Sequence, residues 1–116
     1  MVDDDKLTRD FVANVLTFSV NREVQSFDSG FSAWNYIKTG ERPDIIVSDV
    51  DMPEMDGFDL LSRVKKRCPD KICIMMSGDP ENEISAKRLG ADAFLAKPFG
   101  LNDLFNIVET YIVKDN

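Results

Sequence analysis

The sequence of 116 residues contains no histidine and only two cysteines, Cys68 and Cys73. The absence of histidine excludes the most common general base, histidine-dependent catalytic triads and nearly all zinc sites. Two cysteines are too few for a disulfide scaffold or a four-ligand metal cluster, and no apolar run approaches the ~20 residues that span a membrane. No signal peptide is recognisable, so we expect a reduced, cytoplasmic protein without a membrane partner.

Positive charge is also in short supply. Fourteen Lys and Arg residues stand against twenty-one Asp and Glu residues, so the formal net charge is −7 and direct nucleic-acid binding is not expected. The apolar share of 43% and the charged share of 30% are ordinary for a globular protein. Folding a chain of this length buries about two-thirds of its extended surface, so residues 1–116 are expected to form one domain with its own core.

Strand and helix patterns alternate along the chain. Residues 45–47 and 72–76 are continuous apolar runs, as expected of strands covered on both faces, and residues 93–96 predict a shorter strand. A more polar strand is predicted at residues 23–27, and Met1 and Val2 are expected to form the tail of a first strand. Five such alternations predict an α/β fold. The expected architecture is a single flavodoxin-like (βα)5 domain, with a parallel five-stranded sheet of order 2-1-3-4-5 and helices on both faces.

Polar residues follow four of the five predicted strands directly. Because the carboxyl ends of parallel strands meet at one edge of the sheet, these side chains are expected to gather there. They are Asp3, Asp4 and Asp5 after the first strand, Asp49 after the third, Ser77 after the fourth and Lys97 after the fifth.

The chemistry of this set is that of an anion held beside a cation. Carboxylates ~4 Å apart repel by about 4 kcal/mol per pair, so they must share a proton or hold a cation, and oxygen ligands alone favour Mg²⁺. Lys97 is then expected to pair with an anion, and Ser77 to donate a hydrogen bond to it. These groups around Asp49 predict a cage for a phosphoryl group, with Asp49 as a nucleophile that forms an acyl phosphate. For the Asp3–Asp5 run alone, a solvated acidic surface is the alternative.

Four segments resemble the signatures of two-component response regulator receiver domains, the family that includes the chemotaxis regulators. Residues 49–57, DVDMPEMDG, resemble the segment that carries the phosphoacceptor. Residues 2–5 (VDDD), 76–78 (MSG) and 97–99 (KPF) resemble the other three signatures, in the family's order and spacing. The resemblance extends over the whole chain.

The resemblance implies a phosphoacceptor with a bound metal. Asp49 would accept a phosphoryl group from a phosphohistidine on a sensor histidine kinase or a histidine phosphotransfer protein. Asp4 and Asp49 would bind Mg²⁺ directly, Asp3 would act through a water molecule, and the backbone carbonyl of Asp51 would be a further ligand.

The resemblance also implies a switch. Lys97 would pair with the phosphoryl oxygens, and Ser77 would be drawn toward one of them. Phe94 matches the family's aromatic switch position, although a plain core aromatic is the alternative for it. The face formed by the fourth helix, fifth strand and fifth helix would then change its preference for a downstream effector. Such a protein is not an enzyme, because it catalyses only its own phosphorylation and slow autodephosphorylation.

Two local predictions concern the first strand and the start of the fourth helix. Receiver domains usually open with several apolar residues before the acidic pair, whereas this chain has only Met1 and Val2. The first strand is therefore expected to be truncated, with its neighbours underpaired. Farther along, Asp79 as N-cap and Pro80 at the first helical position predict the start of a helix.

Two other functions fit parts of the pattern. Residues 49–51 also resemble the nucleophile segment of haloacid-dehalogenase-type phosphatases, in which the second Asp is the general acid and base. Those enzymes carry the nucleophile on the first strand of a longer fold, whereas here the acidic residues come first. The other alternative is a receiver-like interaction module that is never phosphorylated, which the presence of both Asp49 and Lys97 disfavours.

Overall fold

The computed structural model describes residues 1–20, 23–40 and 43–113. Three parallel strands form its sheet in the order β1-β2-β3, namely β1 (Ile45–Asp49), β2 (Ile72–Ser77) and β3 (Ala93–Ala96). The helices are α1 (Lys6–Val20), α2 (Gly30–Lys38), α3 (Gly57–Arg67), α4 (Asn82–Arg88) and α5 (Leu101–Val108), followed by a π-helical turn, η1 (Glu109–Val113). Among the residues described, no helix has the length and apolar character needed to cross a membrane.

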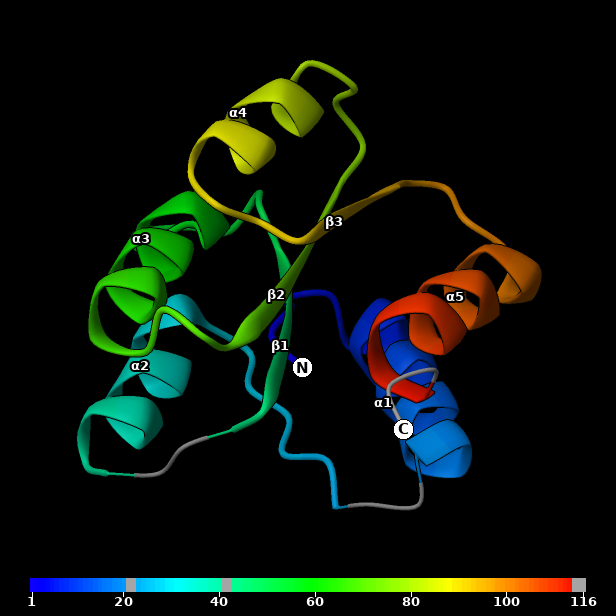
Figure 1. Cartoon of the computed structure of the whole chain (residues 1–116), viewed down its shortest axis with the longest axis horizontal. Coiled ribbons are helices and arrows are strands. Elements are labelled where there is room, and N and C mark those ends of the chain that lie inside the picture. Colours follow the sequence, from blue (N-terminus) through cyan, green and yellow to red (C-terminus); the bar gives the residue numbers. More distant parts are fainter. Residues whose placement is uncertain (21–22, 41–42, 114–116) are drawn as a thin grey trace.

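Helices cover both faces of the sheet. α1 and α5 pack on one face and α2 and α3 on the other, with α4 near β3 (Figure 1). The core divides accordingly into two clusters. Leu60, Leu61 and Val64 of α3 belong to one, and Val12 of α1 and Leu104 of α5 to the other. β1 and β2 lie between them, which is why both strands are mainly apolar and their polar residues come at the carboxyl end. The predicted α/β fold with a parallel sheet is confirmed.

The N-terminal segment pairs with the sheet through Val2. Val2 forms parallel bridges with Phe27 on one side and Ser48 on the other. Its N–H donates to the carbonyl of Val47 at 2.8 Å, and its carbonyl accepts from the N–H of Asp49 at 2.9 Å. Val2 therefore occupies the position of the first strand in the order 2-1-3-4-5, and this brings the acidic residues after it to the end of β1.

Two predicted boundaries are wrong. Residues 23–27 form no strand apart from the bridge at Phe27, because pairing with the segment beside them is short: it is limited to hydrogen bonds that join Met1 and Asp3 to the backbone of Gln25 and Phe27. α4 begins at Asn82 rather than at Pro80. The carboxylate of Asp79 accepts from the N–H of Glu81 at 3.0 Å, and its carbonyl accepts from the N–H of Asn82 at 3.0 Å. These bonds make a turn before the helix.

Gly57, the first residue of α3, is tightly packed against the end of β1. A Cβ atom there would lie 2.2 Å from the carbonyl oxygen of Asp49 and 2.7 Å from the Cα of Val50. Since both are backbone atoms, Gly57→Ala is expected to lower the free energy of unfolding by about 2 kcal/mol, measured by urea denaturation. Gly78→Ala is the matched control, because a Cβ there meets nothing within 4 Å. Equal stability of the two variants would contradict this account.

Candidate functional site

Three carboxylates meet at the carboxyl edge of the sheet. One oxygen each from Asp3, Asp4 and Asp49 lies within 4.8 Å of the others. Asp3 is 0% exposed and Asp49 is 3% exposed, whereas Asp4 is exposed to solvent. The Val2 bridges place Asp3 beside the end of β1, so residues 46 positions apart in the sequence share one hollow.

Lys97, which follows β3 directly, reaches into the same hollow. Its Nζ lies 2.9 Å from Oδ1 of Asp49 and 3.2 Å from Oδ2 of Asp3. Its backbone N–H donates to the carbonyl of Ser77 at 2.8 Å, which fixes the start of the side chain relative to β2. The side chain of Lys97 is 25% exposed, so one ammonium links two buried carboxylates while remaining in contact with solvent.

The buried charges shift one another's pKa values. Burial raises the pKa of Asp49 from its ordinary 3.8 to about 6; the Lys97 ammonium opposes the rise, and the charges of Asp3 and Asp51 add to it. Burial alone would lower the pKa of Lys97, but the hydrogen bond and charge of Asp49, together with Asp3, raise it overall. Asp49 therefore has an unfavourable ionised state that a further cation would stabilise.

This shift predicts a pH dependence of stability in metal-free buffer. Folded protein binds more protons at Asp49 than unfolded protein does between pH 3.8 and about 6, so the free energy of unfolding falls as the pH rises through that window. The loss attributable to Asp49 is on the order of 2–3 kcal/mol. Urea denaturation of native protein and of Asp49→Asn at several pH values measures it. Parallel pH profiles for the two proteins would refute the shift.

Ser77, the last residue of β2, is buried and hydrogen-bonded on all sides. Its hydroxyl donates to Oδ2 of Asp51 at 3.0 Å. It accepts from Nδ2 of Asn82 at 2.8 Å and from the N–H of Asp79 at 3.0 Å. The sequence predicted the backbone carbonyl of Asp51 as a metal ligand, but it predicted neither the bond from Ser77 to the Asp51 side chain nor any role for Asn82. The sequence does place an amide side chain five residues after the end of a strand, which could have indicated this contact. An Asn at the start of a helix, however, usually caps that helix.

Phe94, the proposed aromatic switch, lies in β3 opposite Met75 of β2. It is half-buried and packs against the core cluster that lies under α2 and α3. Phe94 thus lies three residues before Lys97, on the strand that leads to the ammonium, and it packs against that cluster while remaining partly exposed.

The donor atoms suit Mg²⁺. All of them are oxygens, and the hollow combines two buried carboxylates with an exposed one. The buried Oδ1 of Asp49 meets the Lys97 ammonium at 2.9 Å and has no other hydrogen-bond donor among the described residues. Asp3 is held in place by the N–H of Asp5, which donates to its Oδ1 at 2.9 Å. A hard cation would complete the charge balance of this set.

Comparison with known proteins identifies the family. Residues 1–109 match the family described as the response regulator receiver domain. The chain belongs to the response regulator receiver domain family. Residues 1–109 are therefore a receiver domain of the kind found in two-component signalling.

Individual similar proteins support this family assignment. A chemotaxis protein CheY homologue from Campylobacter jejuni is 30% identical over 103 residues, which are 85% of this chain and 79% of that protein. The DNA-binding transcriptional regulator NtrC of Azospirillum brasilense is 33% identical over 94% of this chain, which spans 23% of that protein's length. The crystal structure of a CheY-like receiver domain protein from Methanospirillum hungatei JF-1 superposes with a TM-score of 0.86 at 28% identity, covering 97% of this chain and 90% of that one.

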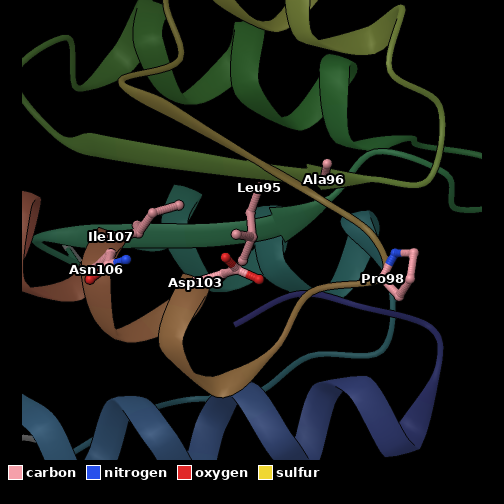
Figure 2. Close-up of a pocket in the computed structure, with 6 residues that line it drawn as sticks. All are labelled: Leu95, Ala96, Pro98, Asp103, Asn106 and Ile107. Carbon is pink, nitrogen blue, oxygen red and sulfur yellow. The ribbon is translucent and has the colours of Figure 1, made fainter.

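The receiver domain has a second hollow beside the acidic one. It lies between β3 and α5 and has a volume of about 400 Å³. Figure 2 shows its lining, which comes from the end of β3, from Pro98 and from one side of α5. The lining residues are Leu95, Ala96, Pro98, Asp103, Asn106 and Ile107. Because Pro98 follows Lys97 directly, the two hollows share the segment that carries the ammonium.

Proposed function

We propose that Asp49 accepts a phosphoryl group from a phosphohistidine of a sensor histidine kinase or a histidine phosphotransfer protein. A carboxylate oxygen of Asp49 bonds to phosphorus as the P–N bond of the phosphohistidine breaks, and the departing imidazole nitrogen takes up a proton. One observation carries this proposal: the buried Asp49 carboxylate lies 2.9 Å from a lysine ammonium and within 4.8 Å of two further carboxylates. A nucleophile, an anion partner and a cation site are thus adjacent.

The proposal assigns the metal to the same hollow. Asp4 and Asp49 bind Mg²⁺ directly, Asp3 acts through a water molecule, and the backbone carbonyl of Asp51 is a further ligand. When bound, Mg²⁺ neutralises charge on the transferring phosphoryl oxygens. Lys97 pairs with another of these oxygens, a role supported by its present contacts with Asp49 at 2.9 Å and Asp3 at 3.2 Å.

The signal to a downstream effector arises from movement around phosphorylated Asp49. Ser77 turns toward a phosphoryl oxygen, Phe94 follows inward, and the face made by α4, β3 and α5 changes its affinity for a downstream effector protein or domain. The hollow between β3 and α5 (Figure 2) belongs to that face. Residues 1–116 act as one receiver domain in the cytoplasm, and slow autodephosphorylation resets it.

Phosphoryl uptake tests this proposal directly. The protein is incubated with a small acyl phosphate and Mg²⁺, and its intact mass is followed over time. We expect one added phosphoryl group per chain, no addition after chelation of the metal, and a slow return to the starting mass. Steady hydrolysis of a small phosphate ester would instead indicate a phosphatase. No uptake from the small donor or from any phosphohistidine donor would indicate an interaction module.

A further inference from the structure

The hydroxyl of Ser77 has no capacity left for another hydrogen bond. A serine hydroxyl offers one proton and two lone pairs. The proton is donated to Oδ2 of Asp51 at 3.0 Å, and the lone pairs accept from Asn82 at 2.8 Å and from the N–H of Asp79 at 3.0 Å. Ser77 is 0% exposed, so water does not compete for these positions. An anion on Asp49 can obtain this proton only if Asp51 loses it.

These three partners come from different parts of the chain. Asp51 lies in the loop after β1, Asp79 lies in the loop after β2, and Asn82 is the first residue of α4. The hydroxyl of Ser77 therefore connects the loop that follows Asp49 to the start of α4. Any rotation that redirects the proton also moves the lone pairs to which the amide of Asn82 donates.

α4 buries few of its own side chains. Ala86 is its buried residue, whereas Ile84 is 65% exposed. Glu81, which precedes the helix, makes no side-chain cap hydrogen bond. The side-chain amide of Asn82 thus provides the polar side-chain tie between the helix start and the end of β2.

We propose that Asn82 is a positioning residue: together with Asp51 it holds Ser77 in the resting orientation, and it transmits the rotation of Ser77 to α4. This inference rests on the proposed function, because it requires an anion on Asp49. Asp51 competes with that anion for the single proton of Ser77. When Ser77 donates its proton to the anion, the Asn82–Ser77 bond must break or carry the start of α4 with it. Either way the start of α4 is affected through this hydrogen bond, because it loses its tie to the end of β2 or moves with Ser77.

The test uses the full chain with Mg²⁺ and beryllofluoride, a probe with the shape and charge of a phosphoryl group. Hydrogen exchange of the backbone amides of α4 is measured before and after the probe is added. Native protein should change its exchange in α4 when the probe binds. Asn82→Ala should bind the probe with an affinity within about fivefold of native while losing most of the α4 response, since one hydrogen bond is removed. Asn35→Ala, at an exposed position on α2, is the matched control and should respond like native protein.

A second pair of variants tests whether Asp51 competes with the anion for the proton of Ser77. Asp51→Asn and Asp51→Ala both remove the charge, but Asn keeps an oxygen that can accept from Ser77. Comparing these two variants therefore isolates the hydrogen bond. Asp51→Ala should bind beryllofluoride about fivefold more tightly than Asp51→Asn, because the proton of Ser77 is no longer held. Asp51 is exposed, so these variants are expected to fold even if Asn82→Ala does not.

The outcomes separate this inference from the proposed function. A full α4 response in Asn82→Ala, or equal probe affinities for the two Asp51 variants, would overturn the role of the Asp51–Ser77–Asn82 connection while leaving Asp49 as phosphoacceptor. Failure of native protein to bind beryllofluoride with Mg²⁺ would overturn both.

Discussion

Asp49→Ala is expected to take up no phosphoryl group under conditions in which native protein takes up one per chain. The reason is geometric. Asp49 is the carboxylate that the Lys97 ammonium meets at 2.9 Å, at the end of a buried strand where the reacting oxygen is fixed. Asp3 is engaged by the N–H of Asp5 and by Lys97, and Asp4 is exposed to solvent, so neither is positioned to replace the nucleophile. Intact mass spectrometry measures the loss.

The same experiment carries its own controls. Asp59→Ala removes an exposed carboxylate from the first turn of α3 and should keep the full mass increase. Asp49→Ala should remain folded, because it removes a buried carboxylate whose pKa burial has raised, so its thermal midpoint at neutral pH is expected to equal or exceed that of native protein. A phosphoryl group on a folded Asp49→Ala variant would show that another residue is the acceptor.

Lys97→Ala should separate metal binding from anion binding. Removing the ammonium takes a positive charge away from the carboxylates, so Mg²⁺ should bind at least as tightly as in native protein at a pH well above the pKa of Asp49. Beryllofluoride should bind about 10- to 100-fold more weakly, the usual effect of losing a hydrogen bond to a charged group. Isothermal titration with each ligand measures the two effects, and their opposite directions distinguish this account from general damage to the fold.

Lys71 provides the matched control for that variant. It is about as buried as Lys97 and pairs with Asp44 at 3.9 Å, away from the acidic hollow. Lys71→Ala should leave both titrations unchanged. Loss of Mg²⁺ binding in Lys97→Ala, or an unchanged affinity for beryllofluoride, would mean that Lys97 serves the structure rather than the anion.

The strands that are buried on both faces could be predicted from the sequence. The apolar runs at residues 45–47 and 72–76 lie inside β1 and β2, because strands between two helical layers need apolar side chains on both faces. The place of the N-terminal segment was predicted from topology instead: the order 2-1-3-4-5 puts Met1 and Val2 between residues 23–27 and β1, and Val2 does bridge Phe27 and Ser48. That residues 23–27 would form only a bridge was not predictable, because their alternating pattern does not show how many residues the neighbouring segment pairs with them.

Convergence at the site followed from topology. Asp3 follows the bridged Val2, Asp49 ends β1 and Lys97 follows β3, and because these segments run parallel, the sheet brings all three to one edge. The detail around Ser77 could not be inferred in this way. Which acceptor takes a hydroxyl proton depends on rotamers and on loop geometry, and the start of α4 depends on a turn that Asp79 makes with its neighbours. The amide of Asn82 enters the site only because of that turn.

The most direct test of the account is a crystal structure of this protein with Mg²⁺ and beryllofluoride. We predict beryllium on a carboxylate oxygen of Asp49, Mg²⁺ beside it on oxygens that include those of Asp4 and Asp49, and the ammonium of Lys97 on a fluorine. A structure with the probe bound to another residue, or with the lysine turned out of the acidic hollow while the probe occupies it, would contradict the account.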